Sequence, residues 1–303
     1  MGSTYSHMVF VPPTPPTYEV NENQELKYYR VRNNEAVSVA FVKVGSHESK
    51  VSGKKIPLAV FRAPSSGGIG KEHFTLLYAH GNGEDLGLVA SYVEQLCTDC
   101  DVTVVAYDYT GYGAAQTRPE KTPDSGSKSE KVGAECSEKA FYSDAEAAYD
   151  FCVSTLKVPF NRLVLVGRSI GSGPTTHLAS TREAAATILI SPLASCVRVV
   201  MNIKRTMFFD MFANIDKVAS IGCPILIVHG KEDEVVPFSH AAMLVERINS
   251  APNPVRLETL FLDDVGHNDM ELSHQPAMHE FYRNFLDSLE PDRSYAPKPK
   301  TKK

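Results

Sequence analysis

The sequence lacks features that would define two large classes of protein. No apolar run approaches the roughly 20 residues that span a bilayer, and the N-terminus has no apolar stretch typical of a secretory signal. Positive charge is not in excess, because the formal net charge is −5 and charged residues of both signs are spread along the chain. This balance argues against binding to nucleic acid. We therefore expect a cytoplasmic protein with no transmembrane helix and no nucleic-acid partner.

Cysteine is also sparse. The six cysteines are Cys97, Cys100, Cys136, Cys152, Cys196 and Cys223. Six in 303 residues is too low a density for a disulfide scaffold, so we expect reduced thiols. Cys97 and Cys100 form one C-x-x-C pair, but no second pair or histidine cluster accompanies them, which favours a buried helix face over a zinc site. The sequence predicts neither a metal nor a cofactor.

What the sequence does contain is a regular alternation of apolar and amphipathic segments. The segments that read as strands are 37–44, 56–63, 73–81, 102–109, 162–167, 185–192, 224–230 and 256–264. Helical stretches such as 143–156 separate them. This alternation predicts an α/β fold with right-handed crossovers, a mostly parallel central sheet and helices on both faces. In such sheets the chemistry lies at the carboxyl ends of the strands.

The chain divides into three zones. Residues 1–17 contain four prolines and no helical or strand period, which predicts an extended leader along the surface rather than part of a core. Residues 18–290 form the α/β domain. Residues 291–303 are rich in proline and lysine, and we expect a disordered basic tail. A long polar loop over 118–138 follows the strand at 102–109.

One strand runs directly into the pattern G-x-S-x-G. Residues 163–174 read LVLVGRSIGSGP, with Ser169 between Gly167 and Gly171. A strand, this pentapeptide and then a helix are typical of a nucleophile elbow, a tight turn that presents the serine to substrate. The alternative is a phosphate-binding or structural turn, but a P-loop needs a lysine where this chain has Pro174.

A serine hydroxyl needs a base and an orienting acid, which in this kind of fold follow in the order Ser, Asp, His. Asp233 lies in the polar loop after the strand at 224–230, and His267 lies just beyond the strand at 256–264. His240, His274 and His279 fall in helical patterns, where a surface or capping role is expected. The remaining competitors for the acid are Asp263, Asp264 and Asp269. They share the histidine's own loop and are poorly placed to reach its far nitrogen, so the order favours Ser169, Asp233 and His267.

An acyl-transfer site also needs two donors for the developing oxyanion. The backbone amide of Ile170, directly after the nucleophile, is the first candidate, and the amide of Asn82, in the loop after the strand at 73–81, is the second. We expect His80 to be structural and bonded to the backbone rather than a catalytic base.

These segments resemble a known family. AYDYTGYG at 106–113, GRSIGSGPTTHLAS at 167–180, SPLASCVRVV at 191–200, residues 214–241, GHNDMEL at 266–272 and the leader VFVPPTPPTYEV at 9–20 are similar to the α/β-hydrolase domain-containing protein 17 family. The resemblance spans about residues 9–287. It implies an α/β-hydrolase fold with a small cap or none, and a serine hydrolase that removes long acyl chains from protein cysteines. It also assigns the triad roles to Ser169, Asp233 and His267, with S-acylated proteins as substrates at the cytosolic face of membranes.

Other functions stay open at this point. A serine peptidase or general esterase could use the same fold, because fold does not set substrate, and a non-catalytic scaffold is a third hypothesis. A thiolate is a good leaving group, which favours thioesters and esters over peptides. Residues 207–215, MFFDMFANI, could line an acyl groove or belong to the core.

The two ends of the chain carry the signals for membrane association. The family usually begins with an acylated cysteine cluster, whereas this chain has no cysteine before Cys97. MGSTYS instead fits the N-myristoylation pattern with Gly2 as acceptor, and a chance match or a cloning scar is the alternative. One myristoyl chain binds membranes only marginally, so a second signal is needed. The terminal residues Lys298, Lys300, Lys302 and Lys303 could supply it. The expectation is peripheral association with the plasma or endosomal membrane.

Overall fold

The computed structural model describes most of the chain. The described residues are 9–32, 35–51, 53–62, 65, 73–116, 136–201, 203, 205–290, 295 and 297. Gly2, the four terminal lysines and most of the 118–138 loop, for which the sequence made predictions, lie outside them.

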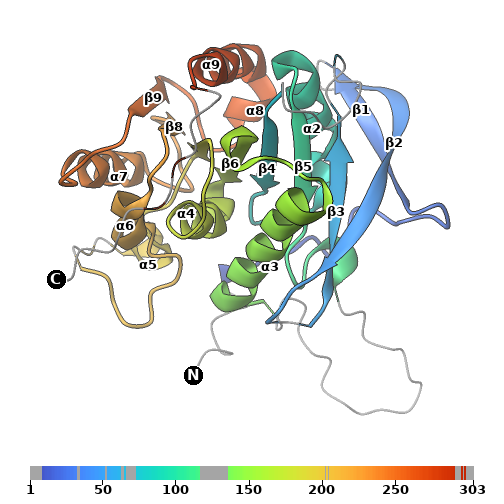
Figure 1. Cartoon of the computed structure of the whole chain (residues 1–303), viewed down its shortest axis with the longest axis horizontal. Helices are drawn as coiled ribbons and strands as arrows, with labels where there is room; N and C mark the ends of the chain where they lie inside the picture. The colour runs from blue at the N-terminus through green and yellow to red at the C-terminus, as the bar shows by residue number, and fades with distance from the viewer. Residues whose placement is uncertain are drawn as a thin grey trace.

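A twisted sheet forms the centre of the molecule (Figure 1). Its nine strands, counted over the described residues, follow the spatial order β1-β2-β3-β5-β4-β6-β7-β8-β9. The bounds are β1 Glu25–Arg32, β2 Glu35–Glu48, β3 Lys55–Phe61, β4 Thr75–Ala79, β5 Thr103–Tyr107, β6 Leu163–Arg168, β7 Ala186–Ile190, β8 Ile225–Gly230 and β9 Leu257–Leu262. Strands β4 to β9 are parallel, and β1 to β3 form an antiparallel edge. The mostly parallel sheet predicted from the sequence is confirmed.

Helices cover both faces of this sheet, as Figure 1 shows. On one face, α2 (Leu86–Cys100) and α9 (Gln275–Asp287) pack against each other and against the apolar side chains of the central strands. On the other face lie α3 (Glu138–Asp150), α4 (Ser172–Ala179) and α7 (Ser239–Asn249). The two layers bury the central strands on both sides, which explains their nearly continuous apolar sequences.

Short helices fill the connections near the carboxyl ends of the strands. Helices α5 (Cys196–Val200) and α6 (Asn214–Lys217) lie between β7 and β8, and α8 (Asp269–Ser273) follows β9. Within the described part of the chain, each helix is too short or too polar to cross a bilayer.

Cys97 and Cys100 lie on the buried side of α2, where their thiols donate to the carbonyl oxygens of Val102 and His279. Burial raises the pKa of both thiols to about 12. The interpretation of this pair as part of a buried helix face is confirmed.

The prediction that the leader lies outside the core is wrong at Phe10. Phe10 is only 1% exposed and packs between the rings of Phe141 and Phe212. Farther along, Tyr18 is buried and its hydroxyl donates to the carboxylate of Asp108. Scarce apolar residues in a proline-rich stretch gave no periodic signal, yet one phenylalanine is enough to fix the segment to the domain.

Candidate active site

The turn after β6 has the geometry of a nucleophile elbow. Ser169 has φ +52°, a left-handed conformation that is uncommon for a residue with a side chain. A Cβ at position 171 would overlap the carbonyl oxygens of Ala79 and His80, and one at position 167 would overlap the side chain of Thr175. Both glycines are therefore needed for close approach, and the strained turn lifts Ser169 to the edge of the sheet.

The three residues expected from the order along the chain meet at this edge. His267 Nε2 lies 3.1 Å from Ser169 Oγ, and His267 Nδ1 lies 2.7 Å from Asp233 Oδ2. All three side chains are buried to at least nine-tenths. They follow β6, β8 and β9, parallel strands whose carboxyl ends share one edge of the sheet. The arrangement can move a proton from the serine hydroxyl to the imidazole.

Asp233 is held by several donors. Its Oδ1 accepts from the backbone N–H groups of Val235 and Val236, at 3.0 and 2.7 Å. His229 Nε2 lies 3.3 Å from Oδ2, in addition to the contact with His267. Burial alone would raise the pKa of this carboxyl, but the hydrogen bonds from His229 and His267 outweigh burial and hold the pKa below its usual range. Asp233 is thus ionised and fixed in orientation.

Two of the three competing carboxylates are engaged elsewhere. Asp263 pairs with Lys231, 2.6 Å away, and Asp269 accepts from the backbone of Gly266. Both side chains therefore bind partners other than His267 Nδ1, which pairs with Asp233.

Two of the competing histidines are also engaged, and they do not lie where the sequence predicted. His240 and His279 are 2% and 1% exposed, so the expected surface role is wrong for both. His240 accepts at Nδ1 from the amide of Ala194, and His279 Nδ1 contacts Asp99 at 2.8 Å. His274 stands at the start of α9 and makes no side-chain capping bond there. Helix periodicity alone does not distinguish a histidine on an exposed polar face from a histidine that is buried with a hydrogen-bond partner.

The two segments expected to supply oxyanion donors lie against each other. Ile170 belongs to the short helical turn Ser169–Gly171, whose last residue approaches the carbonyl oxygen of His80, two residues before Asn82. The side chain of Asn82 is already engaged, because its amide donates to Val9 and its oxygen accepts from the backbone N–H of Val11. Its backbone amide is therefore the group that fits the expected role.

His80 is structural, as the sequence predicted. Its ring is fully buried, and Nδ1 contacts the carbonyl oxygen of Gly81 at 2.8 Å. Nε2 faces Asp108 at 3.3 Å. Burial would lower the pKa of His80, but Asp108 outweighs it and raises the pKa above its usual value. Asp108 also accepts from Tyr18, so this buried pair connects the loop before Asn82 to the residue that follows the leader.

An ionic network under the elbow has no counterpart in the sequence prediction. Arg168, the residue before the nucleophile, is buried and contacts Glu84, Glu271 and Asn268. Its partners are 84, 103 and 100 positions away along the chain, since they belong to the loops around Asn82 and His267. The one available signal was an arginine inside an otherwise apolar strand and turn.

The segment from Met207 to Ile215 divides into two parts. Met207, Phe208 and Phe209 are 41%, 95% and 54% exposed, whereas Phe212 is fully buried and packs on Gly173 at the start of α4. The exposed part is an apolar projection on the connection between α5 and α6.

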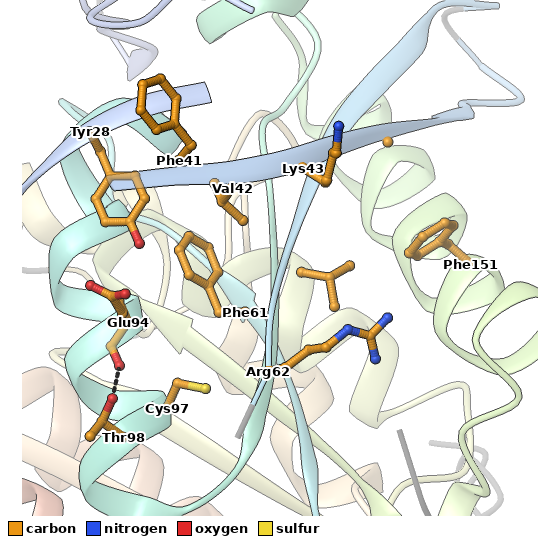
Figure 2. Close-up of a pocket in the computed structure, with 12 residues that line it drawn as sticks. Tyr28, Phe41, Val42, Lys43, Phe61, Arg62, Glu94, Cys97, Thr98 and Phe151 are labelled. Atoms are coloured by element: carbon orange, nitrogen blue, oxygen red, sulfur yellow. Dashed lines mark hydrogen bonds between the residues drawn. The ribbon is translucent and has the colours of Figure 1, made fainter. Parts of the chain in front are cut away.

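Two further features bear on ligands. Among the described residues there is no group of three or more histidine, cysteine, aspartate or glutamate side chains arranged to hold a metal ion. A cavity of 610 Å³ lies where β2 separates from β3 beside α2, with Tyr28, Phe61 and Glu94 in its lining (Figure 2). Its lining includes none of the triad residues, so this cavity is separate from the candidate active site.

Family models match most of the described domain. The model "Serine aminopeptidase, S33" matches residues 70–214, and "Prolyl oligopeptidase family" matches residues 199–289. Solved structures share the fold. An esterase from Thermogutta terrifontis matches with a TM-score of 0.60 at 16% identity, over 83% of this chain and 94% of that one. A serine hydrolase homologue from Coxiella burnetii matches with a TM-score of 0.54 at 18% identity, over 80% and 97%.

The fold and the elbow define an α/β-hydrolase of the serine hydrolase superfamily. "Alpha/beta hydrolase domain-containing protein aho-3" of Caenorhabditis elegans is 33% identical over 291 residues, 94% of this chain and 78% of the relative. "Alpha/beta hydrolase domain-containing protein 17C" of Xenopus laevis is 39% identical over 203 residues, 67% of this chain and 58% of the relative. The mouse protein of the same name is 38% identical over 214 residues, and again 58% of its length is covered. The chain belongs to the alpha/beta hydrolase domain-containing protein 17 family.

Proposed function

We propose that this chain is a serine hydrolase that cleaves long-chain acyl thioesters from S-palmitoylated proteins. The observation that carries the hydrolase part is the hydrogen-bonded set Ser169, His267 and Asp233 behind a strained elbow. The thioester part rests on the family resemblance and on leaving-group chemistry, since a cysteine thiolate, with a pKa of about 8.5, leaves more readily than an amine.

The proposed reaction has two steps. Ser169 Oγ attacks the acyl carbonyl carbon while His267 Nε2 takes the hydroxyl proton, and collapse of the tetrahedral intermediate breaks the C–S bond. The protein cysteine takes the proton from His267 and leaves as the thiol, which returns the imidazole to its neutral form. In the second step His267 removes a proton from water, which attacks the acyl-serine. Collapse of this intermediate breaks the bond to Ser169 Oγ, and His267 returns the proton to Oγ as the fatty acid is released. Asp233 stays ionised throughout and holds the imidazole tautomer.

The oxyanion of both tetrahedral intermediates would be held by the backbone amides of Ile170 and Asn82. Loss of one such donor costs about 10²- to 10³-fold in rate in related chemistry. The apolar projection formed by Met207, Phe208 and Phe209 supports a long-chain substrate, because these exposed side chains offer an apolar contact surface on the connection between α5 and α6.

A serine peptidase is the second candidate, and the two matching family models favour it. The two candidates differ in leaving group, so the discriminating measurement is kcat/KM for a palmitoyl-cysteine peptide against a chromogenic dipeptide amide. We expect the thioester to be the better substrate. A tenfold preference for the amide, about 1.4 kcal/mol in transition-state binding, would favour the peptidase instead. A general esterase would hydrolyse short- and long-chain esters and thioesters alike.

We further propose that the hydrolase acts at a membrane surface, with Gly2 myristoylated and Lys298, Lys300, Lys302 and Lys303 as the second signal. Myristate supplies the inserted chain, and the lysines add a salt-sensitive attraction of about 1 kcal/mol each to anionic lipid. Cell fractionation at low and high salt should show Gly2→Ala released to the soluble fraction. If Gly2→Ala remains fully membrane-bound, the myristoylation pattern is a coincidence.

A further inference from the structure

A single guanidinium connects the loops that carry the candidate oxyanion donor and the catalytic histidine. Arg168 is the last residue of β6, directly before Ser169, and its side chain is 6% exposed. Nη1 lies 3.2 Å from Glu84 Oε1, Nε lies 2.9 Å from Glu271 Oε2, and Nη2 donates to Asn268 Oδ1 at 2.9 Å. The planar fork of an arginine can hold three such partners in fixed directions, which a lysine cannot.

The first set of contacts of the Arg168 guanidinium reaches the loop that carries Asn82. Glu84 contacts Arg168 through Oε1, and its other oxygen accepts from the backbone N–H of Gly81 at 2.6 Å. Gly81 immediately precedes Asn82, so this carboxylate fixes the peptide that leads into the candidate oxyanion donor. A Cβ on Gly81 would lie only 2.8 Å from Glu84 Oε2 and would overlap the guanidinium. The loop at Gly81 therefore packs directly against the ion pair of Arg168 and Glu84.

The second set of contacts of the Arg168 guanidinium reaches the loop that carries His267. Asn268 is the next residue along the chain, and Glu271 belongs to α8, which begins one residue later. The hydroxyl of Tyr78, on β4, donates to the other oxygen of Glu271 at 3.3 Å. Arg168 thus contacts the segment directly after His267 at two points, Asn268 and Glu271.

The charges in this network make Arg168 difficult to replace. Burial raises the pKa of Glu271 to about 7, and the positive charge of Arg168 opposes that rise. Glu84 is a second carboxylate facing the same guanidinium, so loss of the arginine would leave two carboxylates without their shared cation.

We propose that Arg168 is a positioning residue that sets the Asn82 loop and the His267 loop in register around Ser169. This inference rests on the proposed hydrolase function and adds to it a residue that touches neither substrate nor Ser169 Oγ. A merely structural role would lower the melting temperature and leave the turnover of folded enzyme unchanged. A positioning role lowers turnover itself, because small errors in placement at a reacting centre are costly.

The test uses the full chain and a soluble short-chain ester, p-nitrophenyl butyrate, with active serines counted by fluorophosphonate titration. For Arg168→Met we expect kcat per titrated serine to fall at least 30-fold with KM within threefold, and Arg168→Lys to recover only part of kcat. Arg30→Met is the matched control. It removes an exposed arginine of β1 that pairs with Glu94, and it should keep kcat. An unchanged kcat in Arg168→Met, with only a lower melting temperature, would overturn the proposal.

Two milder variants decide the question if Arg168→Met does not fold. Asn268 is exposed and Glu84 is half-buried, so Asn268→Ala and Glu84→Gln each weaken one connection without leaving the guanidinium alone. Each should lower kcat by about 3- to 10-fold, and normal kcat in both would refute the inference. If the wild-type chain neither hydrolyses the ester nor reacts with the fluorophosphonate, the proposed function fails instead, so the two failures are distinguishable.

Discussion

Replacement of Asp233 by asparagine should invert the tautomer of His267. Oδ1 of Asp233 accepts from two backbone N–H groups, those of Val235 and Val236. An asparagine must keep its carbonyl oxygen in that position, because an NH₂ group cannot accept a hydrogen bond. Its NH₂ group then faces His267 Nδ1, where the carboxylate oxygen now lies at 2.7 Å.

An NH₂ donor at that point requires an unprotonated Nδ1, so the ring proton moves to Nε2. Nε2 is the atom that faces Ser169 Oγ at 3.1 Å, and with its own proton it cannot act as a base. The same substitution in another serine hydrolase with this triad lowers kcat by about 10⁴-fold. That loss corresponds to about 5 kcal/mol of transition-state stabilisation.

The assay is steady-state hydrolysis of p-nitrophenyl butyrate at neutral pH by Asp233→Asn and by Asp263→Asn. The second variant makes the same chemical change at an exposed carboxylate paired with Lys231, so it should retain wild-type kcat. We expect Asp233→Asn to lose about 10⁴-fold in kcat with a folded circular dichroism spectrum. A kcat within tenfold of wild type would refute the assignment of Asp233 as the orienting acid.

Three further outcomes follow from the packing and charges. Phe10→Ala should lower the free energy of unfolding by about 3 kcal/mol in urea titration, because the ring is buried in the core; an unchanged midpoint would mean that the leader is not docked. Gly171→Ala should abolish fluorophosphonate labelling, since its Cβ would overlap the carbonyl oxygen of Ala79, and full labelling would contradict the elbow geometry. Burial raises the pKa of Asp144 to about 6, so between about pH 4 and 6 the folded chain holds a proton that the unfolded chain has lost, and stability falls as pH rises. Asp144→Asn should remove about 2 kcal/mol of this dependence between pH 4 and 7, and an unaltered slope would disprove it.

The sheet and the candidate triad could be predicted because their signals are local. Each of the eight expected segments overlaps a strand of the structure, and the central strands gave the clearest signal because strands buried on both faces need continuous apolar sequence. Ser169, Asp233 and His267 each follow such a strand, and parallel strands bring their carboxyl ends together. Strand β1, Glu25–Arg32, was missed because an edge strand with alternating charges lacks that signal.

Features that depend on distant partners could not be predicted. Phe10 looks like part of an extended leader until Phe141 and Phe212 are folded around it. Arg168 looks like an ordinary polar residue until the loops of Glu84 and Glu271 are brought beside it. Such contacts are set by tertiary structure, and neither periodicity nor a short motif records them.

The central claim is that Ser169 is the nucleophile, and covalent trapping tests it most directly. The native chain and Ser169→Ala would be treated with a fluorophosphonate, digested and mapped by mass spectrometry, with Ser250→Ala as the control at an exposed serine. The account predicts one adduct, on the peptide that contains Ser169, present in the native chain and in Ser250→Ala and absent from Ser169→Ala. An adduct that persists in Ser169→Ala, or that maps to another serine in the native chain, would contradict it.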